Sequence, residues 1–518
     1  MGKRLFLAAT LSFLVLLIWS SFISKTQLIE NKDVMAQRPL AKDATTVVPS
    51  HNKDASLVSG GDLQEPAPSL LTFKQEKFEV TFNESQAALK EVVFTEYKNH
   101  KFVLGSGLVL ADKPLFFKKE DSAANEVRFV HTDAQKRVIK KFIFSNSNYN
   151  IELEILWQNL SSSPIVVQLP FIVGTLDFSG AKDQARYQDI MVATPGKTLN
   201  LNGQRDADWP EFKFMGLRDR YFCVIIQPDT DKHSGFIKKI NPRQSQLGFR
   251  LPEQTVAPGE QIGHKFRIYL GPQQIQWINK ADPAWSLIMH YGTFNLISQL
   301  LVQLLDFLYR QVHNWGLAII LLSLIIYLLL YPLSVKQMRS MKEMNALKPH
   351  IDELRKLYKD SPQKLNKEIM ELYRQHKINP LGGCLPMILQ LPIFFALYQA
   401  LMRSVALKGA HFLWIKDLSE PDRLFMLPTS LPILGNEVNI LPIVMAILML
   451  IQQKSSMATT SGGSAEQEKM MLVIFPLMFG LIFYRMPSGL VLYWLVNSAL
   501  MIFFQLRMAG KRNVPIQH

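Results

Sequence analysis

The sequence predicts a polytopic α-helical membrane protein that carries an exported all-β domain. Three observations support this fold class. Apolar segments of membrane length recur between residues 314 and 506. Residues 71–281 alternate apolar and polar side chains with the period of a β-strand, and one further apolar run stands close to the N-terminus. With 518 residues, the chain is long enough for more than one domain.

The charge composition indicates which kinds of partner the chain could bind. The chain holds 57 Lys and Arg residues against 43 Asp and Glu, a formal net charge of +14. Such an excess is typical of proteins that bind nucleic acid or an anionic membrane face, and the apolar segments favour the membrane. Cys223 and Cys384 lie in very different segments, so no disulfide framework is expected. We find no strong metal-ligand spacing and expect no cofactor.

Residues 1–24 are predicted to form an N-terminal transmembrane anchor. Lys3 and Arg4 precede an uncharged run at 5–24, and its 20 residues can span a bilayer core of roughly 30 Å. The positive end stays in the cytoplasm, so the next segment is exported. The alternative is a cleaved signal peptide, although the only suitable cleavage stretch, 34–36, lies well beyond the apolar run. Residues 25–70 are polar and rich in Pro and Gly, which indicates a flexible periplasmic tether.

Residues 71–281 are predicted to form a β-sandwich. The alternation is clearest at 78–82 and 149–155. Further strands are expected at 92–97, 127–131, 138–144, 164–169, 221–227 and 265–270. Many short strands separated by turn residues are typical of this architecture.

Residues 282–313 change to a helical period. Their apolar stripe consists of Leu287, Tyr291, Phe294, Ile297, Leu301, Leu304, Leu305 and Leu308. Because a spanning segment follows at once, we expect an amphipathic helix that lies in the membrane interface. The alternative is a helix packed against the sandwich.

Five further spans are predicted, at 315–335, 381–402, 438–453, 470–484 and 486–506. With the anchor they make six, which puts both termini in the cytoplasm and residues 25–313 in the periplasm. The spans at 438–453 and 470–484 reach only about 24 and 23 Å, less than the bilayer core. Such mismatch thins the bilayer locally.

Residues 336–378 are predicted to form a cytoplasmic helical hairpin. They contain 11 Lys and Arg and 6 Asp and Glu, in agreement with the positive-inside rule. Ser361 is the expected N-cap of the second helix and Pro362 its first residue. Residues 507–518 form a basic cytoplasmic tail.

The motif at 379–394 places two glycines and three prolines inside an apolar run. Helix breakers persist in a bilayer only where neighbouring helices or water satisfy the freed backbone, which predicts a hydrated cavity. Its uncharged polar candidates are Ser323, Tyr327, Tyr331, Gln390, Tyr493 and Asn497. An apolar slide is predicted from Met387, Phe394, Met471, Phe475 and Met478. The alternatives are polar side chains that join helices and, for the slide, ordinary packing.

The same region contains Asn-Trp-Gly at 314–316, Tyr-Pro-Leu at 331–333, Leu-Trp-Ile-Lys-Asp-Leu at 413–418 and Pro-Ser-Gly-Leu-Val-Leu-Tyr-Trp at 487–494. With the 379–394 motif, their order and spacing resemble the YidC membrane protein insertase family over residues 284–506. The resemblance implies a five-helix insertase core at 314–506 and a periplasmic β-supersandwich. It implies no covalent catalysis.

The implied activity is the insertion and folding of nascent membrane proteins in the bacterial inner membrane, alone or with the Sec translocon. The partners it implies are the lipid bilayer, the ribosome and the signal recognition particle system, without specific nucleic acid. One departure stands out. Family members usually place an arginine in the second span, where this chain has Tyr327, and no Lys, Arg, Asp or Glu occurs between Trp315 and Val335.

Two other functions remain as alternatives. A solute transporter or channel would show internal repeats or intramembrane ion ligands, and we find neither. A membrane-anchored sugar enzyme is suggested by the resemblance of supersandwiches to mutarotase-like folds. It would need a cleft with a paired acid and base.

Overall fold

The computed structural model describes residues 69–509, apart from 111–114, 121–122, 169, 179–186, 202–204, 230–232, 360, 377, 379–384, 432–434 and 458–464. The predicted anchor 1–24, nearly all of the tether, Cys384 and most of the basic tail lie outside the described residues. The described chain belongs to one unit, Pro66–His518.

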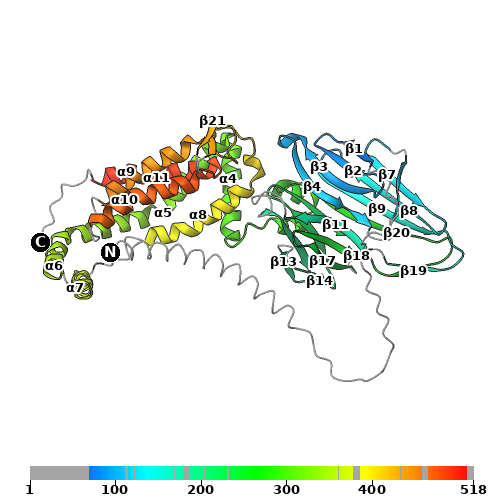
Figure 1. The fold of residues 1–518 in the computed structure, drawn as a ribbon, viewed down its shortest axis with the longest axis horizontal. Helices are drawn as coiled ribbons and strands as arrows, with labels where there is room; N and C mark the ends of the chain where they lie inside the picture. Colours follow the sequence, from blue (N-terminus) through cyan, green and yellow to red (C-terminus); the bar gives the residue numbers. More distant parts are fainter. Residues whose placement is uncertain are drawn as a thin grey trace, which may run out of the picture. The chain divides into compact units, whose positions relative to one another are not determined.

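Residues 70–272 form antiparallel sheets, as the period-two pattern predicts (Figure 1). The largest sheet has the order β13 (Lys197–Leu201), β12 (Asp189–Thr194), β15 (Phe214–Arg218), β16 (Phe222–Pro228), β20 (Gln261–Pro272), β9 (Asn150–Asn159), β8 (Lys136–Phe144), β7 (Glu126–Thr132) and β6 (Lys118–Glu120). A second sheet has the order β14 (Ala207–Trp209), β17 (Ser234–Asn241), β18 (Gln244–Arg250), β11 (Pro170–Asp177) and β5 (Val109–Leu110).

The other strands make a sheet of β1 (Leu70–Lys74), β2 (Phe78–Asn83), β3 (Ala88–Phe94) and β4 (His100–Gly107), and a pair of β10 (Ile165–Val167) with β19 (Gln254–Val256). One hydrophobic core joins the sheets. Alternation sets which side chains enter it, because successive residues of a strand face opposite sides. In β2, for example, Phe78, Val80 and Phe82 are all buried.

The strand predicted at 92–97 is too long. It ends at Phe94, and Thr95–Tyr97 form the short 3-10 helix η1. Lys98 and Asn99 then take positive φ angles of 55° and 53°. Two successive left-handed residues cannot continue a strand, so the chain turns into β4.

The helix predicted at 282–313 is divided into two parts. After α3 (Ile275–Ala281), the 3-10 helix η2 covers Pro283–Ile288, and α4 begins only at Asn295 and ends at Val312. Gly292 lies between them with φ +94°, a conformation that interrupts a right-handed helix.

The apolar C-terminal half is helical: α5 (Trp315–Ala346), α8 (Leu385–Arg403), α9 (Ile440–Met457), α10 (Ala465–Phe483) and α11 (Ser488–Ala509), shown in Figure 1. Among the described residues, Trp315–Lys336 and Ser488–Arg507 are long and apolar enough to cross a membrane. Ile440–Lys454 and Val473–Phe483 are apolar but shorter. The count of six spans therefore stays a prediction.

The hairpin predicted at 336–378 consists of the end of α5, α6 (Lys348–Leu357) and α7 (Pro362–Gln375). Leu347, Ile351 and Tyr373 form a small core of their own. Pro362 starts α7 and Ser361 is its N-cap residue, as predicted, although the Ser361 side chain makes no capping hydrogen bond. Between α8 and α9 lie η4 (Val405–Leu407) and the hairpin of β21 (Phe425–Leu431) with β22 (Gly435–Val438).

Candidate functional site

Three of the predicted polar residues come together between two helices. Tyr493 on α11 is buried, and the side chains of Asn497, one turn later, and Gln390, on α8, both interact with its hydroxyl. Neither contact meets full hydrogen-bond geometry. Asn497 also donates to the backbone carbonyl of Tyr493 over 3.0 Å. Gln390 and Asn497 are only partly buried, so the group extends from the core toward a more open region. We call Gln390, Tyr493 and Asn497 the polar trio.

The other polar candidates lie on α5 and are not joined to the trio by any hydrogen bond found in the described chain. Ser323 is fully buried and donates to the carbonyl of Ile319 over 2.8 Å, so its own helix satisfies its hydroxyl. Tyr327 and Tyr331 both contact Phe504 on α11, with ring centroids 5.0 and 5.1 Å apart. Tyr327 is 8% exposed. Its ring therefore fills the interface between α5 and α11.

The structure describes the side chains of three of the five residues predicted for the apolar slide. Met387 and Met471 fall outside the side chains that the structure describes. Phe394 packs against Trp494 at 5.0 Å, with ring planes at 85°. The ring of Phe475 packs against that of Phe479, with centroids 4.6 Å apart and planes tilted by 38°, and Met478 is exposed.

Phe394 and Phe475 thus belong to an aromatic cluster between α8, α10 and α11 that contains Phe394, Phe475, Phe479, Phe483 and Trp494. Sequence reasoning missed Phe479, Phe483 and Trp494 as members. Their spacing is helical, but the only signal pointing to Trp494 is its place in the 487–494 motif.

Sequence reasoning also missed an ionic junction between the β-domain and the end of α8. Asp189 on β12 accepts hydrogen bonds from Arg218 on β15 and from Arg403 on α8. Burial opposes ionisation of Asp189, but the two guanidinium groups outweigh it and hold the pKa of this carboxyl below its usual value. Arg220 adds a 2.7 Å bond to the carbonyl of Met402. A residue's own sequence neighbourhood carries no signal for such a contact.

Helix α4 presents two apolar faces. One face, with Ser298, Leu301 and Leu305, packs onto the helical core, and the Ser298 hydroxyl donates to the carbonyl of Ala396 over 2.9 Å. Exposed apolar residues lie elsewhere on the helix, namely Leu296, Leu300 and Phe307. The alternative of a helix packed only against the sandwich does not account for the contact with α8.

Among the described residues, no group of three or more His, Cys, Asp or Glu side chains is placed to hold a metal ion.

Comparison with known proteins assigns the family. The model of the 60Kd inner membrane protein family matches residues 307–513, and that of the YidC periplasmic domain matches residues 76–304. A membrane protein insertase YidC from Syntrophobacter fumaroxidans is 37% identical over 377 residues, which cover 71% of this chain and 67% of that protein. The chain belongs to the YidC family of membrane protein insertases. A YidC from Pelobacter propionicus is 33% identical over 72% of this chain and 69% of its own.

Among solved structures, an active YidC insertase with its first transmembrane domain resolved matches with a TM-score of 0.40 and 19% identity, over 87% of this chain and 94% of that one. The family assignment comes from the family models and the sequence relatives. It makes this chain an inner-membrane insertase with a periplasmic β-rich domain, acting on membrane proteins without covalent chemistry.

Proposed function

We propose that the chain inserts nascent membrane proteins through a hydrated groove between α5, α8 and α11, with the polar trio as its hydrophilic wall. The observation that carries this proposal is the convergence of Gln390 and Asn497 on the hydroxyl of Tyr493. That hydroxyl is buried and has no partner of full hydrogen-bond geometry among the described residues, so we infer that a passing polar group meets the partly buried amides of Gln390 and Asn497 first.

Neutral polar groups suit this task. A charge buried in the bilayer is expensive, whereas an amide or hydroxyl exchanges a water for a substrate group at low cost. The polar flank of a substrate would hydrogen-bond to the trio, while its apolar part would stay at the opening of the groove toward the lipid. Tyr327 and Tyr331 would line the neighbouring side, through the edges of rings that pack on Phe504.

The apolar part of the substrate would leave along α10 toward lipid. Val473, Ile474, Leu477 and Met478 are exposed on this helix. We assign Met387, Met471 and Met478 to the slide, with the aromatic cluster as its rigid backing. Burial of the substrate's apolar surface in the bilayer supplies the driving force. The short apolar stretches of α9 and α10, Ile440–Lys454 and Val473–Phe483, would thin the bilayer and shorten the polar path.

The arrangement in the membrane completes the proposal. Residues 1–24 anchor the chain, both termini face the cytoplasm, and α4 lies at the periplasmic surface with Leu296, Leu300 and Phe307 toward lipid. The hairpin of α6 and α7 would receive substrates from the ribosome and the signal recognition particle system. Cooperation with the Sec translocon is part of the same proposal.

The test replaces the polar side chains of the trio with apolar ones. The variant Gln390→Leu/Tyr493→Phe/Asn497→Leu is reconstituted in liposomes and given a short single-span substrate with a polar tail. We expect insertion to fall at least about tenfold, the rate equivalent of one lost hydrogen bond to a buried polar group. The control is Gln452→Leu on α9, whose amide contacts only the Met501 sulfur among the described atoms. Normal insertion by the triple variant would reject the groove.

A further inference from the structure

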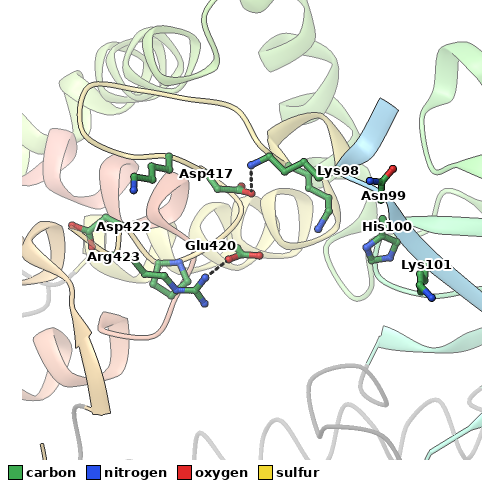
Figure 2. A pocket seen from close by; sticks show the side chains of 11 residues that line it. Lys98, Asn99, His100, Lys101, Asp417, Glu420, Asp422 and Arg423 are labelled. Carbon is green, nitrogen blue, oxygen red and sulfur yellow. Dashed lines mark hydrogen bonds and ion pairs between the residues drawn. The ribbon is translucent and has the colours of Figure 1, made fainter. Parts of the chain in front are cut away.

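A cavity lies where the β3–β4 turn meets the loop between α8 and β21. Its volume is about 580 Å³. The β-domain contributes Lys98, Asn99, His100 and Lys101, and Figure 2 shows Lys98 reaching toward Asp417 of the loop, which also contributes Glu420, Asp422 and Arg423. Lys408 and Lys416 complete the charged lining. No residue of the polar trio or the aromatic cluster lines it.

The acidic groups of the cavity are already engaged. Asp422 accepts from the backbone N–H groups of Ile440 and Leu441 over 2.9 and 3.0 Å, so it caps the N-terminus of α9. Glu420 is paired with Arg423, and Asp417 with Lys98 at 3.5 Å, as Figure 2 shows.

Two cations remain uncompensated. Within the described chain neither Lys408 nor Lys416 forms an ion pair, and Lys416 is exposed. The ammonium of Lys408 lies over the ring of Tyr221, 5.0 Å from its centroid, which orients it without neutralising it. The cavity therefore offers net positive charge to an anion.

The loop that lines the cavity packs closely against the Lys98 side chain at Gly409. A Cβ on Gly409 would lie 2.5 Å from the Cε of Lys98, and Gly409 itself has φ +74°. The positive φ favours glycine at this point of the loop, beside the flexible end of the Lys98 side chain. The loop is also fixed to α11, because the N–H of Ser488 donates to Glu420 O over 2.8 Å and that of Gly489 to Leu418 O over 2.9 Å. The cavity is thus held at the ends of α9 and α11.

The same loop carries two exposed apolar side chains, and the indole N–H of one of them, Trp414, donates to Asp422 of the cavity over 3.3 Å. Leu413 has a positive φ of 51° and is 75% exposed, and Trp414 is 41% exposed. An exposed Leu–Trp pair beside the end of a spanning helix is typical of the membrane interface, where Trp is enriched. Because the loop contacts the periplasmic domain, this interface is the periplasmic one. A basic cavity therefore adjoins a lipid-facing apolar tip.

We propose that this cavity binds the headgroup of an anionic phospholipid from the periplasmic leaflet. Lys408 and Lys416 contact its phosphate, and the acyl chains run past Leu413 and Trp414 into the bilayer. This lipid site is separate from the substrate groove and does not depend on it.

The test measures lipid binding directly. The full chain in detergent is titrated with phosphatidylglycerol or with zwitterionic phosphatidylcholine, and bound lipid is counted by native mass spectrometry. We expect K408Q/K416Q to weaken phosphatidylglycerol binding about tenfold or more. Each lysine attracts the anionic lipid electrostatically, and the losses from the two substitutions multiply. Phosphatidylcholine binding should be unchanged. The matched control K238Q/K239Q removes two lysine charges from β17, which does not line the cavity.

Equal phosphatidylglycerol binding by the wild type and K408Q/K416Q would overturn the proposal, as would an equal loss in the control. Inorganic phosphate forms a separate arm. If phosphate alone displaces the bound lipid at equal concentration, the site recognises a free anion and the lipid assignment is wrong. Because the substituted lysines make no ion pair in the described chain, the variant should fold, and an unchanged melting temperature checks this.

Discussion

Arg403, the last residue of α8, donates a hydrogen bond of 3.0 Å to the carboxylate of Asp189, the first residue of β12. Arg218 shares the same carboxylate and reaches the carbonyl of Ile288 over 2.6 Å. The Asp189 carboxylate therefore binds Arg403 at the end of α8 directly. Through Arg218 it is also linked to Ile288, in the segment before α4. The carboxylate holds these parts of the chain together, because without it the guanidinium groups of Arg218 and Arg403 would face each other unpaired.

Asp189→Asn should weaken this junction strongly. Removing one partner of a buried pair costs about 3–5 kcal/mol, and we expect the lower end because a fifth of the Asp189 side chain is exposed. The measurement is thermal unfolding in detergent, together with protease cleavage between α8 and β21. The control is Asp208→Asn, whose partner Arg250 is on the surface, with Asp208 69% exposed. Equal losses of stability in Asp189→Asn and Asp208→Asn would show that the buried junction contributes no more than a surface ion pair.

The same carboxyl gives a pH dependence with a defined sign. The folded pKa of Asp189 lies below its usual value, so its contribution to stability is complete above the unfolded pKa of about 4 and is lost as the pH falls further. Wild type should therefore lose stability more steeply than Asp189→Asn below about pH 4.

A second prediction concerns Lys140, which is fully buried in the β-domain. Its ammonium donates to the carbonyls of Ala87 and Leu108 over 2.5 and 2.6 Å, and burial lowers its pKa to about 7. Between that pH and the unfolded pKa of about 10.5, the unfolded chain binds more protons, so stability rises with pH by up to about 1.4 kcal/mol per unit. Below pH 7 the full cost of the buried charge remains.

Lys140→Met should abolish this rise between pH 7 and 9, whatever its effect on absolute stability. The measurement is the unfolding midpoint of the β-structure, followed by circular dichroism across that range. Lys141→Met is the matched control, because the neighbouring Lys141 is paired with Glu126 at 3.2 Å and lies on the other face of β8. A pH slope that survives in Lys140→Met would contradict the assignment.

A third prediction concerns the hairpin of α6 and α7. Deleting residues 340–375 should abolish insertion while leaving the protein folded. A point variant sharpens the test. Ile351→Asp places a charge in the small core with Leu347 and Tyr373, which should cost several kcal/mol and separate the helices.

Leu357→Asp is the control, since Leu357 is 72% exposed. Insertion rate and protease accessibility of the hairpin are measured together. Loss of insertion in both point variants would assign the effect to added negative charge, and normal insertion by the deletion would show that the hairpin is dispensable.

Local pattern predicted alternating strands such as β2 and β8 and missed β15, although it did predict the largely buried β16. β2 and β8 alternate and were predicted, whereas every residue of β15 is buried. A strand covered on both sides has no period of two, so 214–218 gave no signal. The junction of Asp189 with Arg403 joins residues 214 positions apart. Only the folded chain brings them together.

In the candidate site too, the sequence indicated some residues, and only the packing of the helices revealed the others. Motif positions pointed to Gln390, Tyr493 and Asn497 because polar residues inside apolar spans are few. The aromatic cluster escaped prediction since Phe479 and Phe483 look like ordinary lipid-facing residues until α8 and α11 pack against α10. Helix packing decides which apolar residues back a site, and packing is not a local property.

The last prediction concerns Tyr327, at the position where the resemblance described in the sequence analysis implies an arginine. Its ring stacks on Phe504 with centroids 5.0 Å apart and planes at 20°. Tyr327→Phe keeps this contact and removes one hydroxyl, so insertion should stay within about twofold of wild type. The measurement is the insertion rate of matched substrates with acidic, neutral or basic tails. Because neither Tyr nor Phe carries a positive charge, neither protein should prefer acidic tails through this position. A strong acidic preference that disappears in Tyr327→Phe would show that the hydroxyl takes over the role of the family's arginine, and that the groove does not work by hydration and neutral hydrogen bonds alone.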